Sequence, residues 1–117
     1  MELTLGQKQR LFAKLVPRLI DFAYSQGYEL TLGDAYRDPR VHGDIGAKKS
    51  YSSANSSHKD RLAIDLNLFK DGVYLTSSEA HKPLGEFWKS LHPDCRWGGD
   101  FKTPDGNHYS MTHQGRA

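Results

Sequence analysis

The sequence is poor in cysteine and has no long apolar segment. Cys95 is the only cysteine among 117 residues, so no internal disulfide can form. No run approaches the roughly 18 apolar residues that a membrane-spanning helix needs, and we expect no membrane insertion. The first residues, MELTLGQKQR, lack a basic start followed by an apolar stretch, so we expect no secretory signal. Cys95 also has no histidine at a useful spacing to activate it, and we expect an unreactive thiol.

An excess of charge of one sign is also missing. Sixteen Lys and Arg residues face fourteen Asp and Glu residues, which gives a formal charge of +2. This balance does not indicate a nucleic-acid partner, but it is compatible with approach to an acidic polymer such as a cell wall. The length predicts a single domain over residues 1–117 with a small core, and we expect a monomer.

Apolar periodicity predicts a first helix over residues 4–26. Thr4 and Gln7 fit a capping box at its start, and Gly27 is typical of the residue after its end. Pro17 lies in the middle of this segment, and we expect it to kink the helix or divide it in two.

The rest of the chain predicts short strands and a second helix. This helix starts either with a capping box formed by Thr76 and Glu79 or at Pro83, and it ends at Leu91. Strands are predicted at residues 28–36 (interrupted at Gly33), 61–69, 73–75, 95–97 and 108–111. Because helices and strands do not alternate regularly, the expected fold is α+β, with a small antiparallel sheet and flanking helices.

The strand at residues 61–69 carries a carboxylate among apolar residues. One face holds leucine and isoleucine at every second position, and Asp65 shares the other face with Ala63 and Asn67. A buried carboxylate is costly unless it is paired or binds a metal. The pattern alone fits a solvent-facing strand position equally well.

Two histidines are candidates for ligands that accompany Asp65. His58 ends a serine-rich loop seven residues before Asp65, and His108 follows Asp105 by three residues. Catalytic zinc takes three protein ligands and leaves one position for water, and a carboxylate near a ligand can serve as a general base. Taken singly, His58 fits an exposed loop residue, and Asp105 fits a hydrogen-bonded turn.

Together these segments resemble the zinc D-alanyl-D-alanine peptidases. That family includes VanY-like carboxypeptidases, vancomycin-resistance dipeptidases and phage L-alanyl-D-glutamate endolysins. Residues 56–65 (SSHKDRLAID) resemble its S-x-H-x(6)-D motif, and residues 105–108 (DGNH) resemble its carboxylate-x-x-His motif. Residues 97–101 (WGGDF) and 84–88 (LGEFW) resemble the segments that precede the second motif in endolysins. Arg61 departs from the glycine of many relatives, which puts the local loop shape in doubt.

The resemblance implies a hedgehog/DD-peptidase-like fold and a site for Zn²⁺. His58, Asp65 and His108 would be the zinc ligands, and Asp105 would be the general base. The resemblance also implies that Arg37 contacts the substrate carbonyl or the oxyanion, although Arg37 alone fits a surface residue.

Other residues near these motifs have less specific roles. Ser56 and Trp97 are expected to position the peptide, and His113 is kept outside the metal set as a residue that orients a ligand or contacts substrate. His81 and His92 flank the second helix, and we expect them to cap it or to face solvent.

The function implied by the resemblance is that of a phage endolysin-type zinc peptidase. It would hydrolyse the L-Ala–D-Glu bond of peptidoglycan stem peptides during host cell lysis. Such an enzyme would accumulate in the host cytoplasm and then act on the periplasmic cell wall, with no separate cell-wall-binding domain. The alternatives are a D-Ala-D-Ala carboxypeptidase and a non-catalytic hedgehog-like zinc module.

Overall fold

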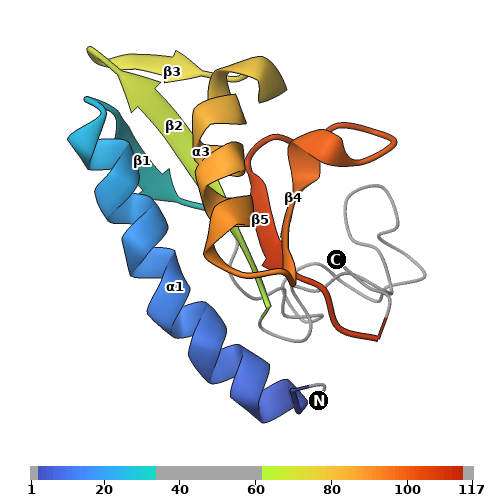
Figure 1. Ribbon diagram of the computed structural model, residues 1–117. Helices are drawn as coiled ribbons and strands as arrows, with labels where there is room; N and C mark the ends of the chain where they lie inside the picture. The colour runs from blue at the N-terminus through green and yellow to red at the C-terminus, as the bar shows by residue number, and fades with distance from the viewer. Residues whose placement is uncertain (1–2, 34–61, 115–117) are drawn as a thin grey trace, which may run out of the picture.

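The computed structural model describes residues 3–33 and 62–114, which form an antiparallel sheet covered on one face by helices (Figure 1). The strands are β1 (Glu29–Leu32), β2 (Ala63–Lys70), β3 (Val73–Leu75), β4 (Cys95–Trp97) and β5 (His108–Met111). The helices are α1 (Leu5–Ser25) and α3 (Ser78–Leu91), and a short 3₁₀ helix, η2 (Gly98–Asp100), follows β4. The expected α+β class is confirmed.

Helix α1 begins and ends as predicted. The Gln7 amide donates to the Thr4 hydroxyl at 3.2 Å, and the Thr4 amide donates to the Gln7 side chain at 2.8 Å. Gly27 follows the helix with φ +88°, a conformation that costs glycine little, and its amide donates to the Tyr24 carbonyl at 3.1 Å.

The expected division of α1 at Pro17 is wrong, because the helix continues through it. Pro17 removes one backbone hydrogen bond, but burial of the apolar face on both sides of it offsets that loss. The buried apolar residues of α1 are Phe12, Leu15, Leu19 and Ala23.

The predicted start of α3 is wrong by a small margin. The capping residue is Ser77, whose hydroxyl accepts the Ala80 amide at 3.1 Å, and not Thr76 paired with Glu79. Pro83 lies inside the helix and does not begin it.

Strand β2 is the centre of the sheet. It pairs with β1 along one edge, and along the other it pairs with β3 through residues 68–70 and with β5 through residues 63–65. The strand predicted over 28–36 ends at Leu32, and the Gly33 amide then donates to the Asp65 carbonyl at 2.7 Å. Residues 34–36 lie outside the described residues.

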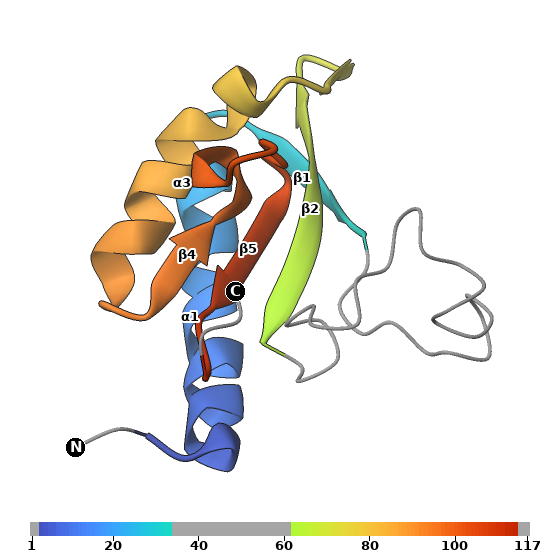
Figure 2. The same cartoon turned by 90° about the vertical axis from the view of Figure 1, so that its right-hand side faces the viewer.

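The alternating pattern of β2 separates the core from the opposite face of the sheet. Leu62, Ile64, Leu66 and Leu68 are at most 7% exposed and belong to the core cluster, as predicted. Figure 2 shows both helices on one side of the sheet. Asp65 and Asn67 therefore belong to the other face, which we call the site face.

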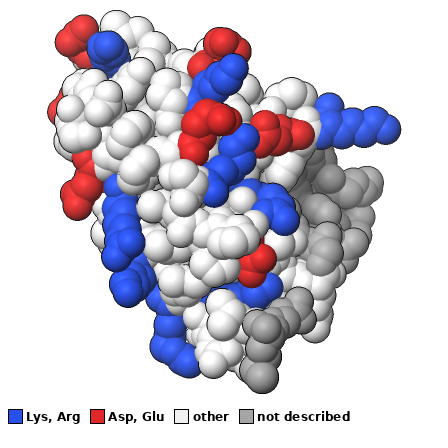
Figure 3. Space-filling model, viewed as in Figure 1, with Lys and Arg blue, Asp and Glu red and all other residues white. Residues whose placement is uncertain are grey.

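The surface of the described residues agrees with the sequence composition. Acidic side chains lie among basic ones on the face viewed in Figure 3, so that this face is not uniformly basic. Within residues 3–33 and 62–114, no helix has the length and apolar character needed to cross a membrane.

Trp97 packs directly against the backbone of α3. Its ring is 5% exposed, and a Cβ added at Gly85 would overlap it. Glycine at position 85 thus allows the helix to lie flat on the indole, at the cost of the lower helix propensity of glycine.

We expect Gly85→Ala to destabilise the protein. Overpacking of a close contact typically costs about 1–3 kcal/mol, which exceeds the roughly 1 kcal/mol that alanine gains in helix propensity. Urea unfolding would measure the change in the free energy of unfolding. Gly6→Ala in α1 is the matched control. A Cβ added at Gly6 would lie 3.6 Å from the nearest heavy atom, a side-chain nitrogen of Arg10, so no loss of stability is expected. A Gly85→Ala protein as stable as the parent would contradict this packing.

Candidate functional site

Asp65 and His108 face each other on neighbouring strands. They are directly paired in the β2–β5 register, and the Asp65 Oδ1 and His108 Nδ1 atoms are 3.6 Å apart. Their side chains are 16% and 6% exposed, respectively, so Asp65 does not occupy a freely solvated face. The sheet thus brings together two of the three predicted zinc ligands from positions far apart in the sequence, and their role as ligands stays a prediction.

The turn before β5 holds Asp105 close to this pair in sequence and in backbone contacts. The Asp105 amide donates to the Gly98 carbonyl at 2.9 Å, and the His108 amide donates to the Asp105 carbonyl at 3.1 Å. A Cβ added at Gly98 would overlap the Asp105 carbonyl and lie 2.8 Å from the His108 Cβ. Asp105 itself is exposed, so its carboxylate is accessible to a substrate.

Trp97 holds the same turn through a hydrogen bond from its side chain. Its indole N–H donates to the Gly106 carbonyl at 2.7 Å, and the Gly106 amide donates to the Ser78 hydroxyl at 2.9 Å. These bonds tie the turn to β4 and α3. Since Trp97 is buried, the structure gives it a supporting position, and its expected contact with a peptide stays a prediction.

The remaining predicted site residues lie outside the described residues. These are His58, Arg37 and Ser56. Within residues 3–33 and 62–114, no group of three or more His, Cys, Asp and Glu side chains could hold a metal ion. The two predicted ligands in these ranges do have the oxygen and nitrogen donors that zinc accepts, and a third ligand would have to come from outside them.

Other buried side chains lie near Asp65 and His108 in the sequence or on the same strand. Ser110 shares the site face with His108 and is fully buried, and its hydroxyl has no hydrogen-bond partner among the described residues. The Phe101 ring lies 5.4 Å from the His108 ring, measured between centroids. His113 is also buried, at 8% exposure, but its contact with a ligand or substrate stays a prediction.

His81 was expected to cap the helix or to face solvent, and this is wrong. It is 2% exposed, and its Nδ1 lies 2.8 Å from the Tyr109 hydroxyl. Burial lowers the pKa of His81 from 6.5 to about 4 and raises the pKa of Tyr109 above its usual range. The helical spacing of His81 from Leu84, Gly85 and Trp88 could have revealed this, because all four share one face.

Two smaller expectations are confirmed. Cys95 is buried, and burial raises the pKa of its thiol to about 12, so it stays protonated at neutral pH. His92 is the C-cap residue of α3, and its Nδ1 accepts the Asp94 amide at 3.0 Å in the turn that follows.

Comparison with known proteins shows the family to which the sequence belongs. The family model described as D-alanyl-D-alanine carboxypeptidase matches residues 50–111, which is more than half of the chain. The chain belongs to this peptidase family. The family expected from the motifs is therefore confirmed, and no curated protein sequence matches the chain.

Two solved structures of peptidases share the fold. The Serratia marcescens L-Ala D-Glu endopeptidase ChiX aligns with a TM-score of 0.66 and 21% identity, over 86% of this chain and 79% of ChiX. A variant of the vancomycin-resistance D,D-pentapeptidase VanY from the VanB-type resistance cassette, in complex with Zn(II), aligns with a TM-score of 0.55 and 22% identity. That alignment covers 87% of this chain and 71% of VanY.

We expect the buried His81 to make stability fall as the pH is lowered. Between about pH 6.5 and 4 the unfolded chain binds a proton at this residue that the folded chain does not, so unfolding is favoured by up to about 3 kcal/mol at the acidic end. His81→Asn keeps an acceptor near Tyr109 and removes this titration. Urea unfolding of both proteins at several pH values would show a flatter profile for the variant. Parallel profiles would contradict the assignment.

Proposed function

We propose that this chain is a zinc-dependent peptidase that hydrolyses peptidoglycan stem peptides. The observation that carries the proposal is the pairing of Asp65 with His108 across β2 and β5, with Asp105 held three residues before His108. Membership of the D-alanyl-D-alanine carboxypeptidase family and a fold shared with a Zn(II)-bound peptidase support it.

The residues fit a zinc ion by their donor chemistry. Asp65 and His108 would hold it together with His58, and when bound it would polarise the substrate carbonyl and lower the pKa of water. Asp105 would take a proton from the attacking water and return it to the departing amine. Arg37 would stabilise the negative charge that develops on the carbonyl oxygen.

The bond that we propose is L-Ala–D-Glu. The shared fold with ChiX, the aspartate at the position of the base and the WGGDF segment at residues 97–101 support this choice. The alternative is removal of the terminal D-Ala, which the description of the matching family favours. Mass spectrometry of digested muropeptides separates them, because an endopeptidase releases the stem peptide and a carboxypeptidase removes one D-Ala.

The biological setting that we propose is host cell lysis by a phage. The protein would accumulate in the host cytoplasm and reach the wall from the periplasmic side after the inner membrane is opened. Cleavage of stem peptides from outside the cell would then give it antimicrobial activity on cells with a permeable outer membrane. Lysis after expression together with a membrane-permeabilising protein, and its absence without that protein, would test this setting.

We expect zinc binding to depend on His58, Asp65 and His108. Alanine at any of these positions removes one of three ligands, so metal analysis of the purified variants should show far less than the roughly one zinc per chain expected of the parent. A chelator should abolish peptide cleavage by the parent, and added zinc should restore it. His92→Asn is the control and should keep its zinc, since its ring caps a turn.

The same measurement separates the catalytic and non-catalytic alternatives. Variants that keep the parent's zinc would overturn the ligand assignment. A zinc-loaded parent that cleaves neither stem peptides nor a terminal D-Ala would favour a non-catalytic module.

We expect Asp105→Asn to bind zinc and to lose most of its activity. Loss of a general acid–base group typically lowers kcat by about 10²–10⁴-fold, and the amide keeps the size of the carboxylate. Rates on isolated muropeptides and zinc content would be measured together. Asp100→Asn is the matched control, because Asp100 is an exposed carboxylate that pairs with Lys89 instead of facing the turn. Cleavage by Asp105→Asn at the parent rate would exclude Asp105 as the base.

A further inference from the structure

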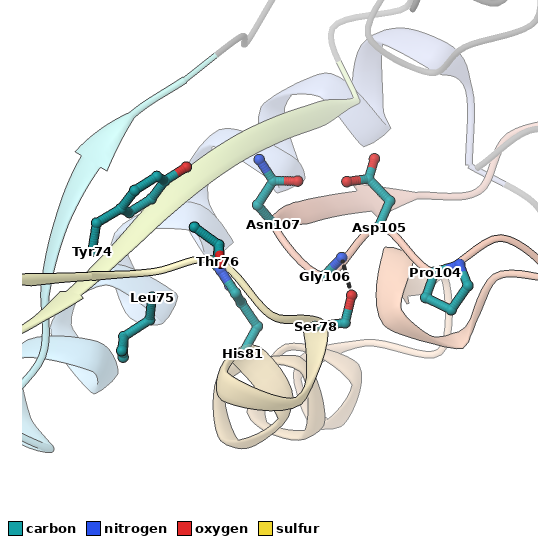
Figure 4. Close-up of a pocket in the computed structure, with 9 residues that line it drawn as sticks. All are labelled: Tyr74, Leu75, Thr76, Ser78, His81, Pro104, Asp105, Gly106 and Asn107. Carbon is teal, nitrogen blue, oxygen red and sulfur yellow. Dashed lines mark hydrogen bonds between the residues drawn. The ribbon is translucent and has the colours of Figure 1, made fainter.

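A pocket of about 170 Å³ lies beside Asp105 and is lined by residues of the 74–81 segment and of the turn at residues 104–107 (Figure 4). Its origin lies in the sheet topology. Strands β3 and β5 pair with the same edge of β2, β3 with residues 68–70 and β5 with residues 63–65. A gap therefore separates the two strands along this edge. The pocket occupies this gap, closed by the first turn of α3.

The lining is polar and carries little charge. It includes side chains with hydroxyl, amide, imidazole and carboxylate groups: Tyr74, Thr76, Ser78, His81, Asp105 and Asn107. Figure 4 shows Asp105 and Asn107 projecting from the same turn, while Ser78 and His81 come from α3. Asp105 is the only carboxylate among the lining residues, and His81 is neutral at neutral pH because burial lowers its pKa to about 4.

His81 contributes a fixed hydrogen-bonding group to this lining. The Tyr109 hydroxyl lies 2.8 Å from Nδ1 of His81, and its O–H can donate to this nitrogen of the neutral imidazole. In that tautomer the hydrogen of His81 is on Nε2, so the ring offers a donor at its other nitrogen. A buried and already oriented donor of this kind suits recognition of a carbonyl oxygen.

We propose that this pocket is a substrate subsite that binds a neutral peptide segment, about one residue long, next to the bond cleaved at Asp105. This proposal rests on the proposed peptidase function. Liquid water occupies about 30 Å³ per molecule, so the volume corresponds to about five or six heavy atoms, the size of a small residue. Donors and acceptors together suit an amide, and the Asp105 carboxylate disfavours a free carboxylate.

The first test fills the pocket without touching Asp105. Thr76 is exposed at the rim, so Thr76→Trp should fold and should occupy the space. We expect KM for a stem peptide to rise about tenfold, with kcat changed less than about twofold, because binding that is equal in ground and transition states is lost. Val73→Trp is the matched control, because Val73 lies three residues earlier in β3, is 59% exposed and is outside the lining. It should keep the parent KM.

The second test reads occupancy directly from the two tryptophans. The Trp97 indole N–H is bonded to the carbonyl of Gly106, which lines the pocket, whereas the Trp88 indole N–H is bonded to the Arg96 and Ser110 carbonyls. Titration of zinc-supplied Asp105→Asn with stem peptide should shift the Trp97 indole signal in ¹H–¹⁵N spectra more than that of Trp88. The Thr76→Trp change should abolish this shift.

The outcomes distinguish a failure of the proposed subsite from a failure of the proposed peptidase function. If the parent cleaves stem peptides but Thr76→Trp keeps the parent KM, the subsite is wrong and the peptidase function stands. An unmoved Trp97 signal at saturating peptide would also overturn the subsite. If the zinc-loaded parent cleaves no stem peptide, the proposed function fails first. Equal rises in KM for Thr76→Trp and Val73→Trp would show a general disturbance of β3 and would contradict the subsite.

Discussion

The pairing of β2 with β5 is the constraint on which the candidate site depends. Side chains alternate along a strand, so a slip of one residue would turn His108 into the core and bring Tyr109 to the site face. Ile64 opposite Tyr109 and the contact of Tyr109 with His81 hold the register from the core side. A buried hydrogen bond on one face of the sheet thus helps to determine that Asp65 meets His108 on the other.

The second constraint is close backbone contact around the turn that carries Asp105. Gly98 accepts the Asp105 amide, and a side chain at position 98 would collide with that turn. Trp97 and Ser78 bind Gly106 from two different elements. The two consecutive glycines of the WGGDF segment therefore leave room for different neighbours. A side chain at Gly98 would overlap the turn at Asp105, and a side chain at Gly99 would overlap the Trp97 ring. The motif predicts the family because it encodes this packing.

The sequence predicted those features that depend on local periodicity or on a complete motif. The alternation of β2 and the capping box of α1 belong to this class, and the family motifs named Asp65 and His108 as candidate ligands before their proximity was known. The failures came where two local signals compete or where tertiary contacts outweigh local preference. Helix α1 passes through Pro17 because its apolar face is buried on both sides, and α3 is capped by Ser77 although Thr76 and Glu79 have the spacing of a capping box.

His81 shows most clearly why position near a helix end misled the prediction. A histidine near a helix start is commonly assigned to the surface, yet its spacing to Leu84 and Trp88 places it on the buried face. All four residues of β5 are buried, with His108 and Ser110 on the site face and Tyr109 and Met111 in the core. Because these faces alternate within one strand, changes that loosen the core side of β5 also displace its site side. Stability and the geometry of the candidate site are therefore coupled through a single strand.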